Sequence, residues 1–132
     1  MIRCVIVEEE EIARNVLKSL LAQYCKDVMV CAEAEDVNSG KAMIEAYRPD
    51  LVFLDIEMPG GSGFKLLSSV DKLDFEVVFI TAYEQFAIKA IRHDALDYLL
   101  KPIDPKELIA AVEKVKEAKY KKGLKKQYDS LL

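Results

Sequence analysis

The sequence has 132 residues, of which 52% are hydrophobic and 32% charged, and its formal net charge is -4. A chain of this length can bury one hydrophobic core without disulfides or metals, so we expect one globular domain. Its apolar runs are too short to cross a bilayer and its first residues do not resemble a signal peptide, so we expect a cytoplasmic protein with no membrane partner, and the net negative charge gives no general argument for nucleic-acid binding.

The first half of the chain alternates short apolar runs with segments of helical periodicity. Residues 3–7, 28–32 and 51–54 are nearly all apolar, which predicts strands that are covered on both faces. Asp36 can cap a helix that ends near Arg48 and Pro49. The inward positions predicted for the first two helices are Ile12, Ala13, Val16, Leu17, Leu20, Leu21, Tyr24, Met43, Ile44 and Tyr47.

The second half repeats this alternation. A turn rich in Gly and Pro leads into a predicted helix over 62–70, then a strand over 76–81, a helix over 84–92 and a brief strand over 97–100. Asp104, Pro105 and Glu107 provide an N-cap, a first-turn proline and an early acid, so they predict the start of a last helix. The inward positions predicted here are Phe64, Leu67, Val70, Phe86, Ala87, Ala90, Ile91, Leu108, Ile109, Val112 and Val115.

Five strands that alternate with five helices predict an α/β fold, a doubly wound parallel sheet of order 2-1-3-4-5 with helices on both faces. Ligands bind such sheets at the carboxyl ends of the strands, where the strand order reverses. That point lies between the first and third strands. We therefore expect Glu8 and Glu9, which follow the first strand, to lie beside Asp55, which follows the third.

Three neighbouring carboxylates need a counter-charge, because two of them about 4 Å apart repel by about 4 kcal/mol at an effective dielectric of about 20. Mg²⁺, bound by carboxylates and water, is typical of phosphoryl-transfer sites. Thr81 and Lys101 follow neighbouring strands, and hydroxyl and ammonium groups both bind phosphoryl oxygens. The residues thus predict that Asp55 attacks a phosphoryl group to form an acyl phosphate. The sequence has no GxxxxGK[ST] loop to hold a nucleotide, so we expect no kinase activity.

Taken together, the acidic turn and the segments FLDIEMPGGSGF, ITAY and DYLLKP resemble the receiver domain of two-component response regulators. The resemblance covers about residues 2–120. The segment VFITAYEQFAIKAIRHDALDYLLKPI is most similar to receivers of the LytR/AlgR (LytTR) type, whose full-length members carry a C-terminal DNA-binding domain. We therefore expect a flavodoxin-like receiver domain over 1–120 and, over 121–132, a basic helical extension that leads toward an output domain outside this chain.

The resemblance implies a role for each residue of the acidic turn. Asp55 would be the acceptor of phosphate from a sensor histidine kinase, and no turnover enzyme is expected. Mg²⁺, or Mn²⁺ in its place, would be held by Glu9, Asp55 and the backbone carbonyl of Glu57, and Glu8 would act through water.

The same resemblance implies a switch. Thr81 would follow the phosphoryl group, Tyr98 would change rotamer with it, and Lys101 would hold the phosphate, with a cis bond to Pro102. Homodimers would form through the fourth helix, fifth strand and fifth helix. DNA would be bound only through the output domain.

One departure from the family pattern leaves an alternative open. Receivers usually carry one or two aspartates after the first strand, whereas both positions here are glutamates, Glu8 and Glu9. The extra methylene of Glu9 extends its carboxylate further into the pocket, and a displacement of about 1 Å can cost on the order of 100-fold in rate. A pseudo-receiver that acts through protein contacts without phosphate is therefore the alternative hypothesis.

Two other classes share the fold. A haloacid-dehalogenase-like phosphatase also uses an Asp nucleophile after a strand, but it needs a second aspartate two residues later, where this chain has Glu57. A flavodoxin-like FMN carrier needs a phosphate-binding loop rich in Ser, Thr and Gly after the first strand, where this chain has four glutamates.

Two remaining features carry structural predictions. Cys4, Cys25 and Cys31 lie in apolar surroundings without a CxxC pair, so we expect reduced thiols in the core. Seven lysines between 114 and 126 indicate a solvated helix end, which Gly123 is expected to loosen.

Overall fold

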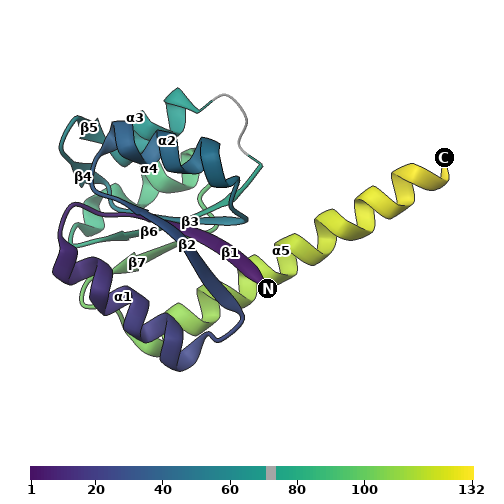
Figure 1. Ribbon diagram of the computed structural model, residues 1–132, viewed down its shortest axis with the longest axis horizontal. Helices are drawn as coiled ribbons and strands as arrows, with labels where there is room; N and C mark the ends of the chain where they lie inside the picture. Colours follow the sequence, from purple (N-terminus) through teal and green to yellow (C-terminus); the bar gives the residue numbers. More distant parts are fainter. Residues whose placement is uncertain (71–73) are drawn as a thin grey trace.

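The computed structural model describes residues 1–70 and 74–132, and it places a five-stranded parallel sheet at the centre of the molecule (Figure 1). The strands lie in the order β2-β1-β3-β6-β7, which is the predicted order 2-1-3-4-5. Their bounds are β1 (Ile2–Val7), β2 (Val28–Ala34), β3 (Leu51–Leu54), β6 (Glu76–Thr81) and β7 (Asp97–Leu100).

The helices cover both faces of the sheet. Helices α1 (Glu11–Tyr24) and α5 (Pro105–Leu131) lie on one face, and α2 (Val37–Tyr47), α3 (Gly63–Ser69) and α4 (Ala87–Arg92) lie on the other (Figure 1). A 3₁₀ turn, η1 (Glu84–Phe86), precedes α4. A two-stranded antiparallel hairpin, β4 (Glu57–Met58) with β5 (Gly61–Ser62), follows β3 and was not predicted from the sequence. Positive φ angles at Gly60 and Gly61 make this tight hairpin possible.

Two hydrophobic clusters fill the space between the sheet and its helices. Every residue of β3 is at most 1% exposed, because helices cover the strand from both sides. On the face of α1 and α5 the cluster includes Leu17, Leu21, Leu108, Val112 and Val115. On the face of α2, α3 and α4 it includes Val37, Ile44, Phe64, Leu67, Val70 and Ala90.

The predicted helix starts are confirmed. The Asp36 carboxylate accepts a hydrogen bond from the Ser39 amide at 2.7 Å, and the Ser39 hydroxyl accepts one from the Asp36 amide at 3.3 Å, which forms a capping box. The Asp104 carboxylate accepts from the Lys106 amide at 2.9 Å, with Pro105 at the first helical position.

Some predicted inward positions are wrong. A helix buries only the positions that face the sheet, which on α1 are Leu17 and Leu21, and neighbouring apolar positions lie at the edge of the contact. Along η1 and α4, the 3₁₀ turn rotates each residue further than an α-helix does, so the periodicity shifts and Ile91 points outward. The apolar residues that are exposed against expectation are Ile12, Val16, Tyr24, Tyr47, Ile91 and Ile109.

Strand β2 is less buried than its apolar sequence predicts. It forms one edge of the sheet, and Met29 is 45% exposed. Cys31 on this strand is only half-buried, which corrects its assignment to the core, whereas Cys4 and Cys25 are buried as expected. Burial raises the pKa of Cys4 to about 12, so this thiol stays protonated at neutral pH.

Helix α5 continues without a break through Gly123 to Leu131 and projects beyond the sheet (Figure 1). The local loosening expected at Gly123 stays a prediction, since a continuous helix can still be less stable at a glycine. Among the helices of residues 1–70 and 74–132, none is long and apolar enough to span a bilayer. Three lysines on α5 pair with acids at the amino ends of three strands: Lys116 with Asp27 at 2.6 Å, Lys119 with Asp50 at 3.2 Å and Lys122 with Glu76 at 3.1 Å.

Two glycines provide a matched test of packing. A Cβ at Gly63 would lie 2.5 Å from the backbone oxygen of Asp55, whereas a Cβ at Gly123 would meet nothing within 4 Å. We expect Gly63→Ala to lower the free energy of unfolding by about 2 kcal/mol, because backbone must move to relieve the contact. We expect Gly123→Ala to cause no loss and a gain of up to about 1 kcal/mol from helix propensity. Urea denaturation of both variants checks this, and equal stabilities would contradict it.

Candidate functional site

A polar cavity of about 360 Å³ opens at the carboxyl ends of the strands, where the strand order reverses between β1 and β3. We call it the acidic cavity. This is the edge of the sheet at which the sequence places the candidate site, because parallel strands present their carboxyl ends together. The cavity is lined by Glu8, Glu9, Glu10, Asp55, Glu57, Met58, Ala82, Tyr83 and Lys101.

Asp55 lies directly after β3 and is only 9% exposed. Its amide donates to the carbonyl of Val7 at 3.0 Å, which ties the residue to the end of the neighbouring strand β1. One carboxylate oxygen, Oδ1, accepts from the Ile56 amide at 2.7 Å, and the other, Oδ2, accepts from Lys101 Nζ at 3.0 Å. The carboxylate is thus held in one orientation at the base of the acidic cavity.

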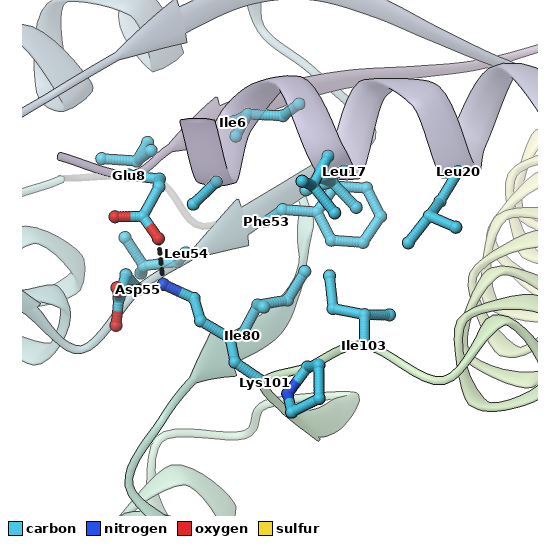
Figure 2. Close-up of a pocket in the computed structure, with 14 residues that line it drawn as sticks. Ile6, Glu8, Leu17, Leu20, Phe53, Leu54, Asp55, Ile80, Lys101 and Ile103 are labelled. Atoms are coloured by element: carbon cyan, nitrogen blue, oxygen red, sulfur yellow. Dashed lines mark hydrogen bonds and ion pairs between the residues drawn. The ribbon is translucent and has the colours of Figure 1, made fainter. Parts of the chain in front are cut away.

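Lys101 joins Asp55 to Glu8 (Figure 2). Its ammonium donates to both carboxylates, and the second Glu8 oxygen accepts from the Glu10 amide at 3.2 Å. Burial raises the pKa of Glu8, and together with the charge of Asp55 it outweighs the hydrogen bond from Lys101. Partial burial alone would lower the pKa of Lys101, but hydrogen bonds to Glu8 and Asp55 hold it above its ordinary value. The site therefore carries more carboxylate than its one ammonium balances.

Glu9 does not join this ion pair. It is exposed, on the rim of the acidic cavity, while Glu8 is buried. The turn that presents both residues is held by Arg14, whose guanidinium donates to the carbonyl of Glu8 at 2.7 Å and to that of Glu9 at 3.0 Å. Sequence reasoning missed Arg14, because its contacts with these carbonyls depend on how α1 lies beside the turn.

The residues that could hold a metal have suitable ligand atoms, but their side chains do not lie in the arrangement of a metal site. Glu8, Glu9, Asp55 and Glu57 all line the cavity and offer the oxygen ligands that Mg²⁺ prefers. Within the described ranges 1–70 and 74–132, however, no three His, Cys, Asp or Glu side chains lie close enough together to form a metal site. The expected convergence of three carboxylates is thus limited to two, Glu8 and Asp55, joined by Lys101.

Thr81 and Tyr98 lie next to the acidic cavity rather than in its lining. Thr81 is fully buried at the end of β6, and its hydroxyl accepts from the Tyr83 amide at 3.3 Å. The Tyr98 hydroxyl donates to the Tyr83 carbonyl, and burial raises the pKa of Tyr98. Both side chains therefore contact the segment after β6 that lines the cavity. The Lys101 amide donates to the Thr81 carbonyl at 2.8 Å, and the Lys101–Pro102 bond is cis, as the family resemblance implied.

The excess of carboxylate predicts a stabilising substitution. A raised pKa means that the folded chain binds the Glu8 proton more tightly than the unfolded chain, so the ionised form opposes folding. Glutamine imitates the protonated form and can still accept from Lys101. We expect Glu8→Gln to raise the free energy of unfolding by about 1 kcal/mol at pH 8.

The pH dependence checks the cause of this effect. As the pH falls through the raised Glu8 pKa toward the ordinary value of 4.5, Glu8 of the wild type becomes protonated. The difference in free energy of unfolding between wild type and Glu8→Gln should then vanish. Urea titrations at pH 8 and pH 5 measure the difference, with exposed Glu35→Gln as the control that should change little. A Glu8→Gln protein less stable than wild type at pH 8 would reject the explanation.

The doubly wound sheet and the acidic cavity at its switch point define a flavodoxin-like domain whose site is built from strand-end carboxylates and one lysine. Comparison with known proteins agrees with this class. A family model described as the response regulator receiver domain matches residues 4–113, and the chain belongs to that family. The resemblance noted from the sequence is therefore confirmed.

Relatives narrow the type of receiver. The sensory transduction protein LytT of Bacillus subtilis is 39% identical over 119 residues, covering 89% of this chain and 49% of LytT. The transcriptional regulatory protein BtsR of Escherichia coli is 35% identical over 125 residues, covering 94% of this chain and 52% of BtsR. The chain spans about half the length of the curated relatives it matches.

A solved structure is also similar over nearly its whole length. The receiver domain of AraT, a response regulator from Geobacillus stearothermophilus, is 33% identical in sequence and superposes with a TM-score of 0.81. The match covers 92% of this chain and 98% of the AraT domain. The LytT relatives agree with the LytR/AlgR type that the sequence indicated.

Proposed function

We propose that this domain accepts a phosphoryl group on Asp55 from the phosphohistidine of a sensor histidine kinase. The observation that carries the proposal is the buried Asp55 carboxylate at the end of β3, with its Oδ2 3.0 Å from Lys101 Nζ. An Asp55 oxygen attacks phosphorus in line, the phosphorus–nitrogen bond breaks, and the imidazole leaves with the bonding electron pair. The product is an acyl phosphate on Asp55, and the domain is a phosphate acceptor rather than a turnover enzyme.

Charge neutralisation is the main task of the surrounding residues. Bound Mg²⁺ or Mn²⁺ supplies positive charge next to the phosphoryl oxygens. Asp55, Glu9 and the backbone carbonyl of Glu57 would hold it, and Glu8 would act through water. Lys101 uses two of the three donors of its ammonium on Glu8 and Asp55, so one donor remains for a phosphoryl oxygen.

The proposed output follows from the residues next to the cavity. Thr81 and Tyr98 both bond to Tyr83, so a phosphoryl group that draws Thr81 toward it would also disturb the Tyr98 hydroxyl. Phosphorylation would thereby shift an existing equilibrium between two arrangements of the Thr81, Tyr83 and Tyr98 contacts. We propose homodimerisation through α4, β7 and α5, a surface whose exposed apolar residues include Ile88, Ile91, Leu100 and Ile109. Sedimentation with and without a phosphodonor measures it.

We also propose that the longer protein contains a C-terminal output domain that binds DNA. The chain covers only about half of LytT and BtsR, and the printed name of BtsR describes a transcriptional regulator. Residues 121–132, at the end of α5, would form the connection to that domain.

Intact mass spectrometry tests the phosphorylation. The chain is incubated with acetyl phosphate in the presence of Mg²⁺ and, separately, of a chelator. We expect a gain of one phosphoryl group with Mg²⁺ and at least about a 100-fold slower gain without it. An equal gain in both reactions would contradict the metal-dependent mechanism.

The arrangement of the glutamates favours a second candidate, a pseudo-receiver that signals without phosphate. Glu9 is exposed, and Lys101 already pairs with both Glu8 and Asp55, so the site is occupied by an internal ion-pair network. Absence of any phosphoryl gain in wild type, together with a gain in Glu9→Asp, would favour this candidate over phosphorylation of the native chain.

A further inference from the structure

A second cavity, of about 350 Å³, lies on the other side of Lys101, between α1 and the sheet (Figure 2). Its walls are apolar side chains from α1, β1, β3, β6 and the segment after β7. We call it the apolar cavity. The residues that form its walls include Ala13, Leu17, Leu20, Phe53, Ile80 and Ile103.

The apolar cavity has one polar end. Glu8, Asp55 and Lys101 line both this cavity and the acidic cavity, so they form the partition between the two. Figure 2 shows Glu8, Asp55 and the Lys101 ammonium together at one end, with Leu17, Leu20, Phe53 and Ile103 further along. Apolar walls with a few convergent polar groups, at a volume of about 300 Å³ or more, are typical of small-molecule sites.

The polar end favours a cation. Two carboxylates face one ammonium there, which leaves an excess of negative charge. The four oxygens of Glu8 and Asp55 each accept one hydrogen bond, from Lys101, from the Glu10 amide or from the Ile56 amide. A carboxylate oxygen can accept a second, so the end of the cavity can take further donors but would repel an anion.

We propose that the apolar cavity binds a small amine with an apolar body, whose ammonium lies against Glu8 and Asp55 and whose hydrocarbon lies between α1 and the sheet. The walls of this cavity take no part in the proposed phosphoryl transfer, so binding requires neither a phosphodonor nor Mg²⁺. An occupant with this charge would compensate the carboxylate that Lys101 leaves unbalanced.

Three ligands of equal chain length test the assignment on the apo chain, without Mg²⁺ or phosphodonor: hexylamine, 1-hexanol and hexanoate. Titrations followed by two-dimensional NMR give the affinities and locate the site. We expect hexylamine to bind at least about tenfold more tightly than 1-hexanol, and hexanoate to bind most weakly. Shifts should centre on Leu17, Phe53 and Ile80.

Matched variants separate the two parts of the site. Ala13→Leu fills the cavity and should weaken hexylamine binding about tenfold, whereas Ala22→Leu, at an exposed position of the same helix, should not. If Ala13→Leu does not fold, Val16→Trp at the half-exposed wall replaces it. Glu8→Gln should remove most of the preference for the amine over the alcohol, and exposed Glu35→Gln should preserve it.

Three results would overturn the proposal. They are no binding of any ligand, equal binding of amine and alcohol, and equal effects of Ala13→Leu and Ala22→Leu. Since the titrations contain no phosphodonor, each of them is independent of whether Asp55 can be phosphorylated.

Discussion

The Asp55→Asn variant is expected to show no Mg²⁺-dependent phosphoryl gain under conditions that label wild type completely. Asparagine keeps the size of the side chain and can still accept from the Ile56 amide, but its amide nitrogen is no nucleophile toward phosphorus. The variant should remain folded, because it also removes one of the two carboxylates that share Lys101. Intact mass spectrometry checks the loss of phosphorylation, and circular dichroism checks that the variant is folded.

Asp50→Asn is the matched control for this experiment. Asp50 lies at the other end of β3, before Leu51, and it also bonds to a lysine, Lys119. The control loses a carboxylate that flanks the same strand but should be phosphorylated like wild type. If Asp55→Asn still gained a phosphoryl group, another residue would be the acceptor and the proposed mechanism would be wrong.

Replacement of Lys101 by methionine should have the second largest effect, in two separate measurements. The phosphorylation rate should fall about 100-fold, because a donor to the developing phosphoryl charge is lost. The free energy of unfolding at pH 7 should fall by about 2 kcal/mol, less than for a fully buried pair because the Lys101 side chain is 26% exposed. The remaining carboxylates, Glu8 and Asp55, would then face each other without a cation.

The sign of the pH dependence distinguishes this cause from lost packing. Without Lys101 the pKa of Glu8 should rise further, so the folded variant takes up a proton as the pH falls below 7 and regains stability relative to wild type. Lys114→Met, which breaks the exposed pair with Asp97, should cost at most about 1 kcal/mol. A loss in Lys101→Met that is the same at pH 7 and pH 5 would point to packing instead.

Most of the fold could be predicted because its signals are local. The apolar runs of the strands, the Asp36 and Asp104 caps and the alternation of elements determine a parallel sheet, and the strand order follows from known topologies. The hairpin of β4 and β5 could not be predicted, because its strands have two residues each. The outward turn of Ile91 was missed because a 3₁₀ turn and an α-helix place the same apolar residues on different faces.

The candidate site, like the fold, could be predicted from the sequence only in part. Strand ends placed Glu8, Asp55 and Lys101 at one edge of the sheet, and the structure brings those three together. It does not bring Glu9 to them, because consecutive residues of a turn point in different directions and sequence spacing alone does not decide which points inward. The contacts of Arg14 depend on how α1 docks beside that turn, which no local pattern reports. The roles in phosphoryl transfer stay predictions.

The three ion pairs between lysines of α5 and acids at the strand ends fix the direction in which the last turns of this helix project. Lys116, Lys119 and Lys122 are anchored on acids at the amino ends of β2, β3 and β6, while the helix continues to Leu131. At about 1.5 Å per residue, the nine residues past Lys122 form a lever arm of roughly 13 Å. A tilt of only a few degrees at the anchors therefore becomes a displacement on the ångström scale at its tip. Because these anchors are surface ion pairs, salt should weaken them and broaden the range of directions in which α5 points.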